Sequence, residues 1–510
     1  LVGSEMCIRD RTTTARLAVA ALRADGRSPI ANTAGANLSS GVATALLDAA
    51  STRPTPRTAL FEVDEAALPE VVRQLAPRVL VLMNLFRDQL DRYGELDRLV
   101  EEWREMVAAL PADCVLVVNA DDPSVASLAE GRAGAMTFGV DDTSMALPSL
   151  PHAADATRCP RCAERLDYTA VLVGHMGHWS CPACGLERPQ PTIRATEVVL
   201  DGAAGLSLTV EVPTGAVRAR VALPGLHNAY NVTAATAAAT AFGIDPTTIA
   251  EAVRSTDAAF GRAESIAVDG REVVVLLAKN PAGANETVRT VLLDPRPLHL
   301  LVALNDRTAD GHDVSWIWDV DYEPLLGRVA SVTVTGDRAY DMALRLRYGG
   351  FSDSVVHVEP EPERALDAAL ASPGDGPLYV LPTYTAMLGI REEDVDSIWE
   401  ELEIKPGSVV GICIRSVKAC PGTTYCKRGQ TDSLGVGMLL DEKYHGMELP
   451  GKMKIGVSGC PNQCSETSFK DIGLVGTRRG WRIYVGGNGG NNPRLGEKLV
   501  QRIDTETALT

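Results

Sequence analysis

The chain lacks a long hydrophobic run, an excess of positive charge and a recognisable secretory leader. No apolar stretch reaches the roughly 18–20 residues that a helix needs to span a bilayer. The 510 residues include 49 lysines and arginines against 66 aspartates and glutamates, a net charge of -17, which argues against nucleic acid as the main partner. The first residues contain no apolar segment of the signal-peptide kind. These absences predict a cytoplasmic protein that neither spans a membrane nor binds nucleic acid.

Eight of the 11 cysteines have the spacing of metal ligands, which indicates a reducing compartment. The first four form two Cys-x-x-Cys pairs with 18 residues between the pairs: Cys159, Cys162, Cys181 and Cys184. Each pair lets two thiolates bind one ion from a tight turn, and two pairs complete a closed tetrahedral site. We therefore predict a structural zinc ribbon over residues 155–190, inserted in a larger domain. Disulfide bonds are the alternative.

The other four cysteines are spaced differently: Cys420, Cys426, Cys460 and Cys464. Five residues separate the first two, 33 the middle two and three the last two. Four thiolates from two separated loops are the usual way to hold a 4Fe-4S cluster. The spacing therefore favours an iron–sulfur centre over zinc or free thiols.

Strand-like and helix-like segments alternate from residue 12 onward. Short apolar runs at 59–63, 79–83 and 114–118 are each followed by a polar turn and a longer helical stretch, such as 97–110. This alternation predicts an α/β fold with a parallel sheet covered by helices on both faces. Functional groups should then gather at the carboxyl ends of the strands.

Polar residues do follow each of these runs: Glu62, Asp64, Glu65, Asn84, Asp88, Asn119, Asp121 and Asp122. Carboxylates at strand ends can hold Mg²⁺ against phosphate oxygens, because Mg²⁺ prefers hard oxygen ligands. A single residue of this kind is more often a turn or helix cap. The ordered series favours a nucleotide site.

Longer motifs point to one family. They are Asn-Thr-Ala-Gly-Ala-Asn at 32–37, Phe-Arg-Asp-Gln-Leu-Asp-Arg-Tyr-Gly at 86–94, Leu-Pro-Gly-Leu-His-Asn-Ala-Tyr-Asn at 223–231, Leu-Ala-Lys-Asn-Pro-Ala-Gly-Ala-Asn at 277–285 and the segment 305–319. With the inserted ribbon, they resemble the Mur ligase superfamily and, within it, the MurT family, over residues 12–387. The resemblance implies a P-loop-type central domain (12–262) and a Rossmann-like C-terminal ligase domain (263–388).

The resemblance also implies an activity: ATP-dependent amidation of the D-glutamate α-carboxylate of lipid II in peptidoglycan biosynthesis. Lipid II would be met at the membrane surface, and a GatD-type glutaminase subunit would supply the ammonia. Residues implied for ATP and Mg²⁺ are Thr12, Thr13, Glu62, Asn84, Asn228 and Arg262. By the same resemblance, Asp313 reaches into the glutaminase and completes its Cys-His-Asp triad; a loop aspartate that caps a helix is the alternative. The aromatic run 316–318 should pack and fix this loop.

One departure concerns the phosphate loop. The residues just before Thr12 read Met-Cys-Ile-Arg-Asp-Arg at 6–11, without the glycines and lysine that cradle phosphate in a P-loop. Residues 1–11 do not resemble the family at all. We therefore expect a foreign or artefactual segment there, and weak ATP binding.

The C-terminal part resembles a different family. Ala-Cys-Pro-Gly at 419–422 and Gly-Gly-Asn-Gly-Gly at 486–490, with the second cysteine set, resemble the α+β siroheme/4Fe-4S domain of sulfite and nitrite reductases from about 389 to 502. The domain is expected over 389–510, with siroheme attached through Cys464. Its usual N-terminal half is missing and no flexible linker precedes it. We therefore expect a chimera of the MurT-like and the reductase-like parts. The alternatives to the ligase function are a siroheme reductase-like redox protein and a zinc-ribbon binding module.

Overall fold

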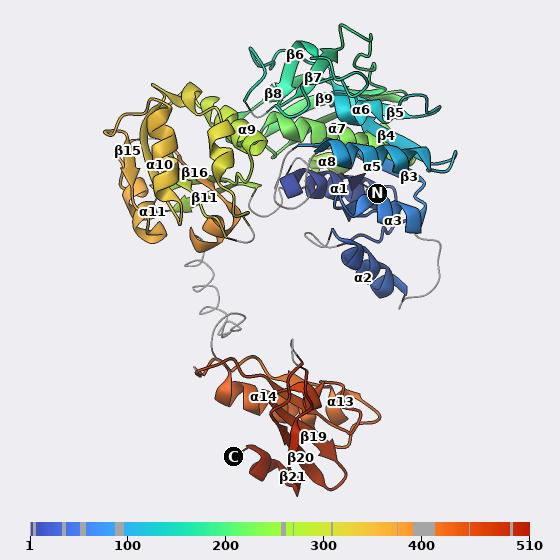
Figure 1. The fold of residues 1–510 in the computed structure, drawn as a ribbon, viewed down its shortest axis with the longest axis vertical. Coiled ribbons are helices and arrows are strands. Elements are labelled where there is room, and N and C mark those ends of the chain that lie inside the picture. The colour runs from blue at the N-terminus through green and yellow to red at the C-terminus, as the bar shows by residue number, and fades with distance from the viewer. Residues whose placement is uncertain are drawn as a thin grey trace. The chain divides into compact units, whose positions relative to one another are not determined.

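The computed structural model describes most of the chain. The described ranges are 2–3, 7–32, 37–50, 58–86, 96–152, 154–256, 262–268, 270–307, 310–374, 376–390, 414–447, 449–489 and 493–509. The chain divides into two compact units, Leu1–Arg391 and Glu392–Thr510 (Figure 1). Each unit has its own sheets and its own hydrophobic core.

The first unit is built on a large twisted sheet. Among the described residues its strand order is β10-β9-β8-β5-β4-β3-β1-β2. The strands are β1 (Val2–Gly3), β2 (Glu62–Val63), β3 (Val79–Leu82), β4 (Val115–Asn119), β5 (Met136–Val140), β8 (Ile193–Leu200), β9 (Leu206–Val212) and β10 (Gly215–Val221). Strands β1, β2, β3, β4, β5 and β8 run parallel to one another, as the alternation of segments predicts.

The antiparallel edge of this sheet was not predicted. Strands β9 and β10 form a hairpin that pairs antiparallel to β8. Residues on β10 alternate between exposed and buried, which is typical of an antiparallel strand with one solvated face. The sheet is therefore mixed rather than purely parallel.

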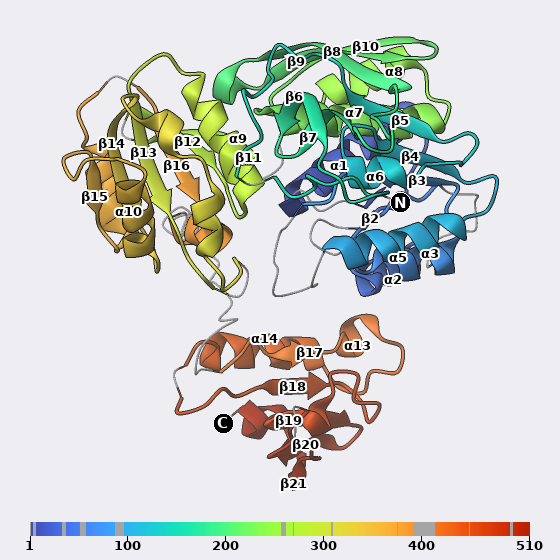
Figure 2. The same ribbon diagram turned by 45° about the horizontal axis from the view of Figure 1, so that its top comes forward.

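Helices cover both faces of the sheet (Figure 2). On one face α1 (Cys7–Ala24), α7 (Leu226–Ala241) and α8 (Pro246–Arg254) pack against one another. On the other face lie α2 (Ser39–Ala50), α3 (Leu68–Leu75) and α5 (Leu96–Ala108). Helix α7 is buried along nearly its whole length, because its alanines are apolar on every side and small enough to lie close to the strands.

The four-cysteine segment contributes a separate two-stranded sheet of β6 (Asp167–Val173) and β7 (Met176–Ser180). The short helix α6 (Pro123–Ser127) packs between this segment and β4, and Ala126 is part of the small core around Trp179. The insert is therefore docked on the large sheet.

The C-terminal part of the first unit has a second sheet, in the order β11-β12-β16-β13-β14-β15 among the residues that are described. Its elements are β11 (Arg262–Val268), β12 (Arg271–Leu276), α9 (Pro281–Leu292), β13 (Leu298–Ala303), η2 (Ser315–Asp319), η3 (Glu323–Leu325), β14 (Val329–Thr335), α10 (Ala339–Tyr348), β15 (Val356–Val358), α11 (Pro362–Leu370) and β16 (Leu378–Pro382). Only β11 is antiparallel to its neighbour. Helices α9 and α10 cover one face and α11 the other, which gives the predicted Rossmann-like arrangement.

The second unit is a smaller α+β body with the strand order β17-β18-β19-β20-β21 in its described part. Its elements are β17 (Lys418–Ala419), α13 (Gly422–Tyr425), α14 (Ser433–Tyr444), β18 (Ile455–Ser458), η4 (Thr467–Phe469), β19 (Ile472–Thr477), β20 (Gly480–Val485), β21 (Glu497–Ile503) and α15 (Thr505–Leu509). Trp481 is 1% exposed at the centre of its core. None of the described helices is long and apolar enough to cross a membrane.

Candidate active site and metal centres

Strand β2, through its first residue Glu62, and helix α1, through Thr12, bring two predicted site residues together. The hydroxyl of Thr12 donates to Oε1 of Glu62 over 3.0 Å, and both side chains are buried. The backbone of Glu62 is held in turn by the side-chain amide of Asn32, which exchanges two hydrogen bonds with it (2.8 and 3.0 Å). The result is a fixed pair of hard oxygen atoms, the kind of donor that Mg²⁺ prefers.

A second group reaches the same edge from α7. Asn228 donates to the carbonyl of Pro224 (2.7 Å) and accepts from Asn231 (2.9 Å). Asn231 accepts in turn from the hydroxyl of Thr14 (3.2 Å). These hydrogen bonds tie the first turns of α7 to the threonines of α1. Sequence reasoning singled out Asn228 but missed Thr14 and Asn231, although Asn231 lies inside the motif at 223–231.

For the other residues predicted to bind the nucleotide, the structure gives a position but no contact that tests the prediction. Thr13 is buried beside Thr12, and Asn84 is 1% exposed immediately beyond β3. Arg262 begins β11, but its side chain lies outside the described residues, as do residues 4–6 and most of the motif at 86–94. The ATP assignments of these residues stay predictions.

The two aspartates that follow β4 have structural partners. Asp121 accepts from Arg188 (2.6 Å), from the N–H of Val140 (2.9 Å) and from the hydroxyl of Tyr230 (2.7 Å). Burial raises the pKa of this carboxyl, while Arg188 opposes the shift. Asp122 caps α6 by accepting from the N–H groups of Ser124 and Val125. With their acceptor positions occupied, these two aspartates are poor candidates for Mg²⁺ ligands.

The four cysteines of the insert converge on one point. Their sulfur atoms all lie within 4.8 Å of one another, and the Cys159–Cys184 and Cys162–Cys181 sulfur pairs are each 3.5 Å apart. A tetrahedron with Zn–S bonds of ~2.3 Å needs sulfur separations of about 3.8 Å. The donor set and its spacing therefore fit a zinc ion.

The two Cys-x-x-Cys turns are built alike. In each, the N–H of the first cysteine donates to the carbonyl five residues later: Cys159 to Glu164 and Cys181 to Leu186, both over 2.7 Å. Each turn also has one residue with positive φ, Ala163 at 60° and Gly185 at 71°. Backbone N–H groups of Cys184 and Ala183 lower the pKa of the Cys181 thiol, whereas burial raises the pKa of Cys159.

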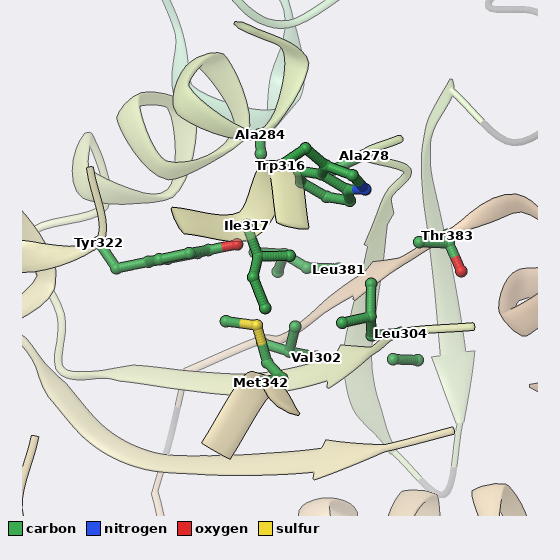
Figure 3. A pocket seen from close by; sticks show the side chains of 11 residues that line it. Ala278, Ala284, Val302, Leu304, Trp316, Ile317, Tyr322, Met342, Leu381 and Thr383 are labelled. Atoms are coloured by element: carbon green, nitrogen blue, oxygen red, sulfur yellow. The ribbon is translucent and has the colours of Figure 1, made fainter. Parts of the chain in front are cut away.

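Asp313 lies on an exposed loop just before η2, where its Oδ1 accepts from the N–H of Ser315 over 2.8 Å. The hydroxyl and then the N–H of Ser315 lower the pKa of the carboxyl. Below the loop, Trp316 and Ile317 close a small apolar cavity of about 20 Å³ against Leu304, Leu381 and Met342 (Figure 3). Room for one water molecule excludes a substrate here. The cavity lies among core side chains of the domain that carries Asp313.

The aromatic run beside Asp313 is only partly buried. Ile317 is 1% exposed, whereas Trp318 is 46% exposed and lies edge-on to Tyr348 of α10. Trp318 therefore packs at the surface of the domain, against Tyr348 and below Arg345, while Ile317 packs in the core.

In the second unit, the two cysteine-bearing loops leave the carboxyl ends of the parallel strands β17 and β18. The N–H of Gly459, next to Cys460, donates to the sulfur of Cys420 over 3.1 Å. Burial raises the pKa of Cys420, but this N–H and the hydroxyl of Ser433 outweigh it, so the pKa lies below its usual value. Cys460 is buried, and Cys426 and Cys464 are exposed. A cluster held by all four stays a prediction.

Comparison with known proteins identifies three matching families. The Mur ligase middle domain matches residues 11–159, the MurT ligase C-terminal domain residues 277–387, and the nitrite and sulphite reductase 4Fe-4S domain residues 410–510. Among solved structures, a pseudomurein peptide ligase type C from Methanothermus fervidus superposes with a TM-score of 0.60 at 19% identity over 78% of both chains. That likeness establishes the fold.

Relatives found by sequence also fall into two groups, one matching the ligase-like part of the chain and the other the reductase-like part. The MurT subunit of lipid II isoglutaminyl synthase (glutamine-hydrolyzing) from Streptococcus pneumoniae is 30% identical over 391 residues, 75% of this chain and 84% of the relative. The assimilatory-type sulfite reductase of Nitratidesulfovibrio vulgaris is 46% identical over 123 residues, 24% of this chain and 56% of the relative. The predicted joining of two families is confirmed: the chain belongs to the MurT family of Mur ligase-fold proteins and carries, in addition, a C-terminal domain of the nitrite and sulphite reductase 4Fe-4S family.

Proposed function

We propose that the chain is the ligase subunit of a glutamine-dependent lipid II isoglutaminyl synthase, acting in the cytoplasm at the membrane surface. The observation that carries the proposal is the hydrogen bond between Thr12 of α1 and Glu62 of β2, beside a second one from Thr14 of the same helix to Asn231 of α7. This places hydroxyl, carboxylate and amide groups around one edge of a Mur ligase sheet, where a nucleoside triphosphate binds in α/β folds of this kind.

The reaction has two steps. A carboxylate oxygen of D-glutamate attacks the γ-phosphorus of ATP, and ADP leaves, so that an acyl phosphate forms. Ammonia then attacks the acyl carbon and phosphate leaves, which gives the amide. Mg²⁺, when bound, neutralises charge on the phosphates. In this chain Thr12 and Glu62 would hold the ion, and Asn228, with Arg262, would orient the nucleotide.

The segment before Thr12 sets the expected strength of nucleotide binding. Residues 6–11 offer no glycine for a backbone N–H cradle, although β1 (Val2–Gly3) pairs with β2 and β3 where a phosphate loop would begin. We infer that residues 1–11 are foreign to the family and that ATP binds weakly. The proposed domains are then 12–262, with the zinc ribbon at 155–190, followed by 263–388 and 389–510.

A glutaminase partner is supported by the surface around Asp313. Exposed apolar side chains line one side of α10 and the adjoining η2: Trp318 (46%), Tyr340 (71%), Leu344 (48%) and Tyr348 (76%). Arg345 ties the two elements together by donating to the carbonyls of Ile317 and Val320. Large exposed aromatic residues are typical of protein interfaces. A GatD-type subunit docked here would meet the Asp313 carboxylate.

The experiment is reconstitution with a GatD-type subunit, glutamine, lipid II and Mg-ATP, with the amide product detected by mass spectrometry. We expect slow but ATP-dependent amidation. Glu62→Gln should lower the rate at least about a hundredfold, as loss of an electrostatic group at a phosphoryl-transfer site does. Glu70→Gln, at a half-buried glutamate in the first turn of α3, is the matched control. Amidation that survives Glu62→Gln unchanged would contradict the site.

A second activity is favoured by the reductase-like unit. The meeting of the Cys420 and Cys460 loops, with a thiol of lowered pKa, supports a 4Fe-4S cluster on Cys420, Cys426, Cys460 and Cys464, with siroheme joined through Cys464. The visible absorption spectrum of protein purified without oxygen tests this. A protein that contains zinc but neither iron nor a tetrapyrrole would contradict the proposed redox activity.

A further inference from the structure

The zinc-ribbon insert makes a buried ionic contact with the large sheet. Arg188 follows Cys184 by four residues, and its side chain is 10% exposed. It donates to Asp121 over 2.6 Å and to Asp141 over 2.9 Å. The second oxygen of Asp121 accepts from the hydroxyl of Tyr230 on α7. A single buried carboxylate therefore joins the insert to the helix that carries Asn228 and Asn231.

The tip of the β6–β7 hairpin makes a second contact. His175 is fully buried, and its Nε2 lies 3.2 Å from Oδ2 of Asp122. The same oxygen accepts from the N–H of Leu85 over 2.8 Å, directly after Asn84. The ring of Phe86 lies against the imidazole, with centroids 4.3 Å apart. The hairpin tip thus fixes the segment that leaves β3.

Backbone contacts continue the docking between these two points. Gly177 donates to the carbonyl of Asp121 (3.0 Å), and the indole of Trp179 donates to the carbonyl of Ala120 (3.1 Å). Arg188 is itself placed by the second cysteine turn, because its N–H donates to the carbonyl of Trp179 and Leu186 accepts from Cys181. An interaction that fixes the second cysteine turn therefore also fixes the position of Arg188.

We propose that the ribbon is a metal-dependent brace for the nucleotide edge, with Arg188 and His175 as its positioning residues. The proposal rests on the proposed function, since it concerns the same edge. A metal ion on the four thiolates cross-links the two turns and keeps Arg188 against Asp121. Loss of the ion releases the second turn, and Asp121 then no longer holds Tyr230 and the first turns of α7.

The test is hydrogen exchange of the nucleotide-free full chain, followed by mass spectrometry. We compare zinc-loaded protein, chelator-treated protein and the variants Arg188→Gln and Arg165→Gln. Arg165 is an exposed arginine of the same insert and serves as the matched control. Bound zinc is counted with a chromophoric chelator. Peptides from α3 report on the far face of the sheet.

Zinc removal should raise exchange in the first turns of α7 and at Leu85–Phe86 by about tenfold, with α3 unchanged. Arg188→Gln should reproduce the α7 effect while zinc stays bound, and Arg165→Gln should not. Normal α7 exchange in zinc-loaded Arg188→Gln would overturn the proposal, even if chelation unfolds the chain. Protection of the Thr12 peptide by Mg-ATP is measured in a separate experiment. If Mg-ATP gives no protection, the proposed function is contradicted. The brace is still judged by the exchange of α7 in the nucleotide-free protein.

Discussion

Asp294 gives a quantitative test of what holds the C-terminal ligase domain together. It follows α9 directly, and its carboxylate accepts from Arg296 (2.8–3.2 Å) and from the hydroxyl of Tyr379 on β16 (2.9 Å). Arg296 is the main cause that lowers the pKa of Asp294 from 3.8 to about 2. At 1.36 kcal/mol per pKa unit, this corresponds to about 2 kcal/mol of stability in the charged state. The Asp294 side chain is 7% exposed but that of Arg296 is 51% exposed, so solvent screens the pair and about 2 kcal/mol is an upper bound.

The sign of the pH dependence follows from the lowered pKa. The stabilisation is present above the unfolded-state pKa and is lost as pH falls toward the folded-state pKa. Asp294→Asn should therefore reduce the free energy of opening by up to about 2 kcal/mol at pH 7, and the difference should vanish between about pH 4 and pH 2.

The assay is hydrogen exchange of β16 peptides at several pH values, because one unfolding free energy is not defined for a chain of several domains. Asp367→Asn, on the exposed side of α11, is the control and should change nothing. An Asp294→Asn effect of equal size at pH 7 and near pH 2 would mean that packing, rather than the ion pair, is responsible.

Three further predictions concern the proposed sites. Asp313→Ala should sharply reduce glutamine hydrolysis by a co-expressed GatD-type subunit while stability stays within roughly ±0.5 kcal/mol; unchanged hydrolysis would leave Asp313 as a loop cap. A Gly-rich loop with lysine at position 11 should raise ATP affinity at least about tenfold, or about 1.4 kcal/mol, by calorimetric titration; micromolar Mg-ATP binding to the unaltered chain would refute the lost loop. Cys464→Ser should abolish the electronic coupling of siroheme to the cluster, and full cluster absorbance in that variant would count against the ligand assignment.

Patterns of short range allowed much of the fold to be predicted. Apolar runs bounded by polar turns located β3 and β4 to within a residue, because a strand buried on both faces must be continuously apolar. The convergence of the ribbon cysteines was predictable for a similar reason. A Cys-x-x-Cys turn fixes two sulfurs locally, so that only one long-range contact remains to be made.

Contacts between distant segments were not predictable in this way. The Thr14–Asn231 hydrogen bond joins residues 217 positions apart, and the Arg188–Asp121 pair joins residues 67 positions apart. Nothing in the local sequence around Arg188 marks it as buried, since arginine is ordinarily exposed. The same holds for Glu286 of α9, which is 4% exposed and faces the N–H groups of Leu226 and His227 at the start of α7.

The strand-end carboxylates show why position alone does not assign a metal ligand. Glu62 is the first residue of β2, whereas Asp121 and Asp122 lie just beyond β4. In the structure Asp121 accepts from three donors and Asp122 from four, and the insert supplies one donor to each. A carboxylate saturated with N–H and O–H donors cannot also bind Mg²⁺ without breaking those bonds. Because the insert contacts both aspartates beyond β4, we expect a metal ion that binds with a nucleotide to be held by Glu62 of β2 and the hydroxyl of Thr12.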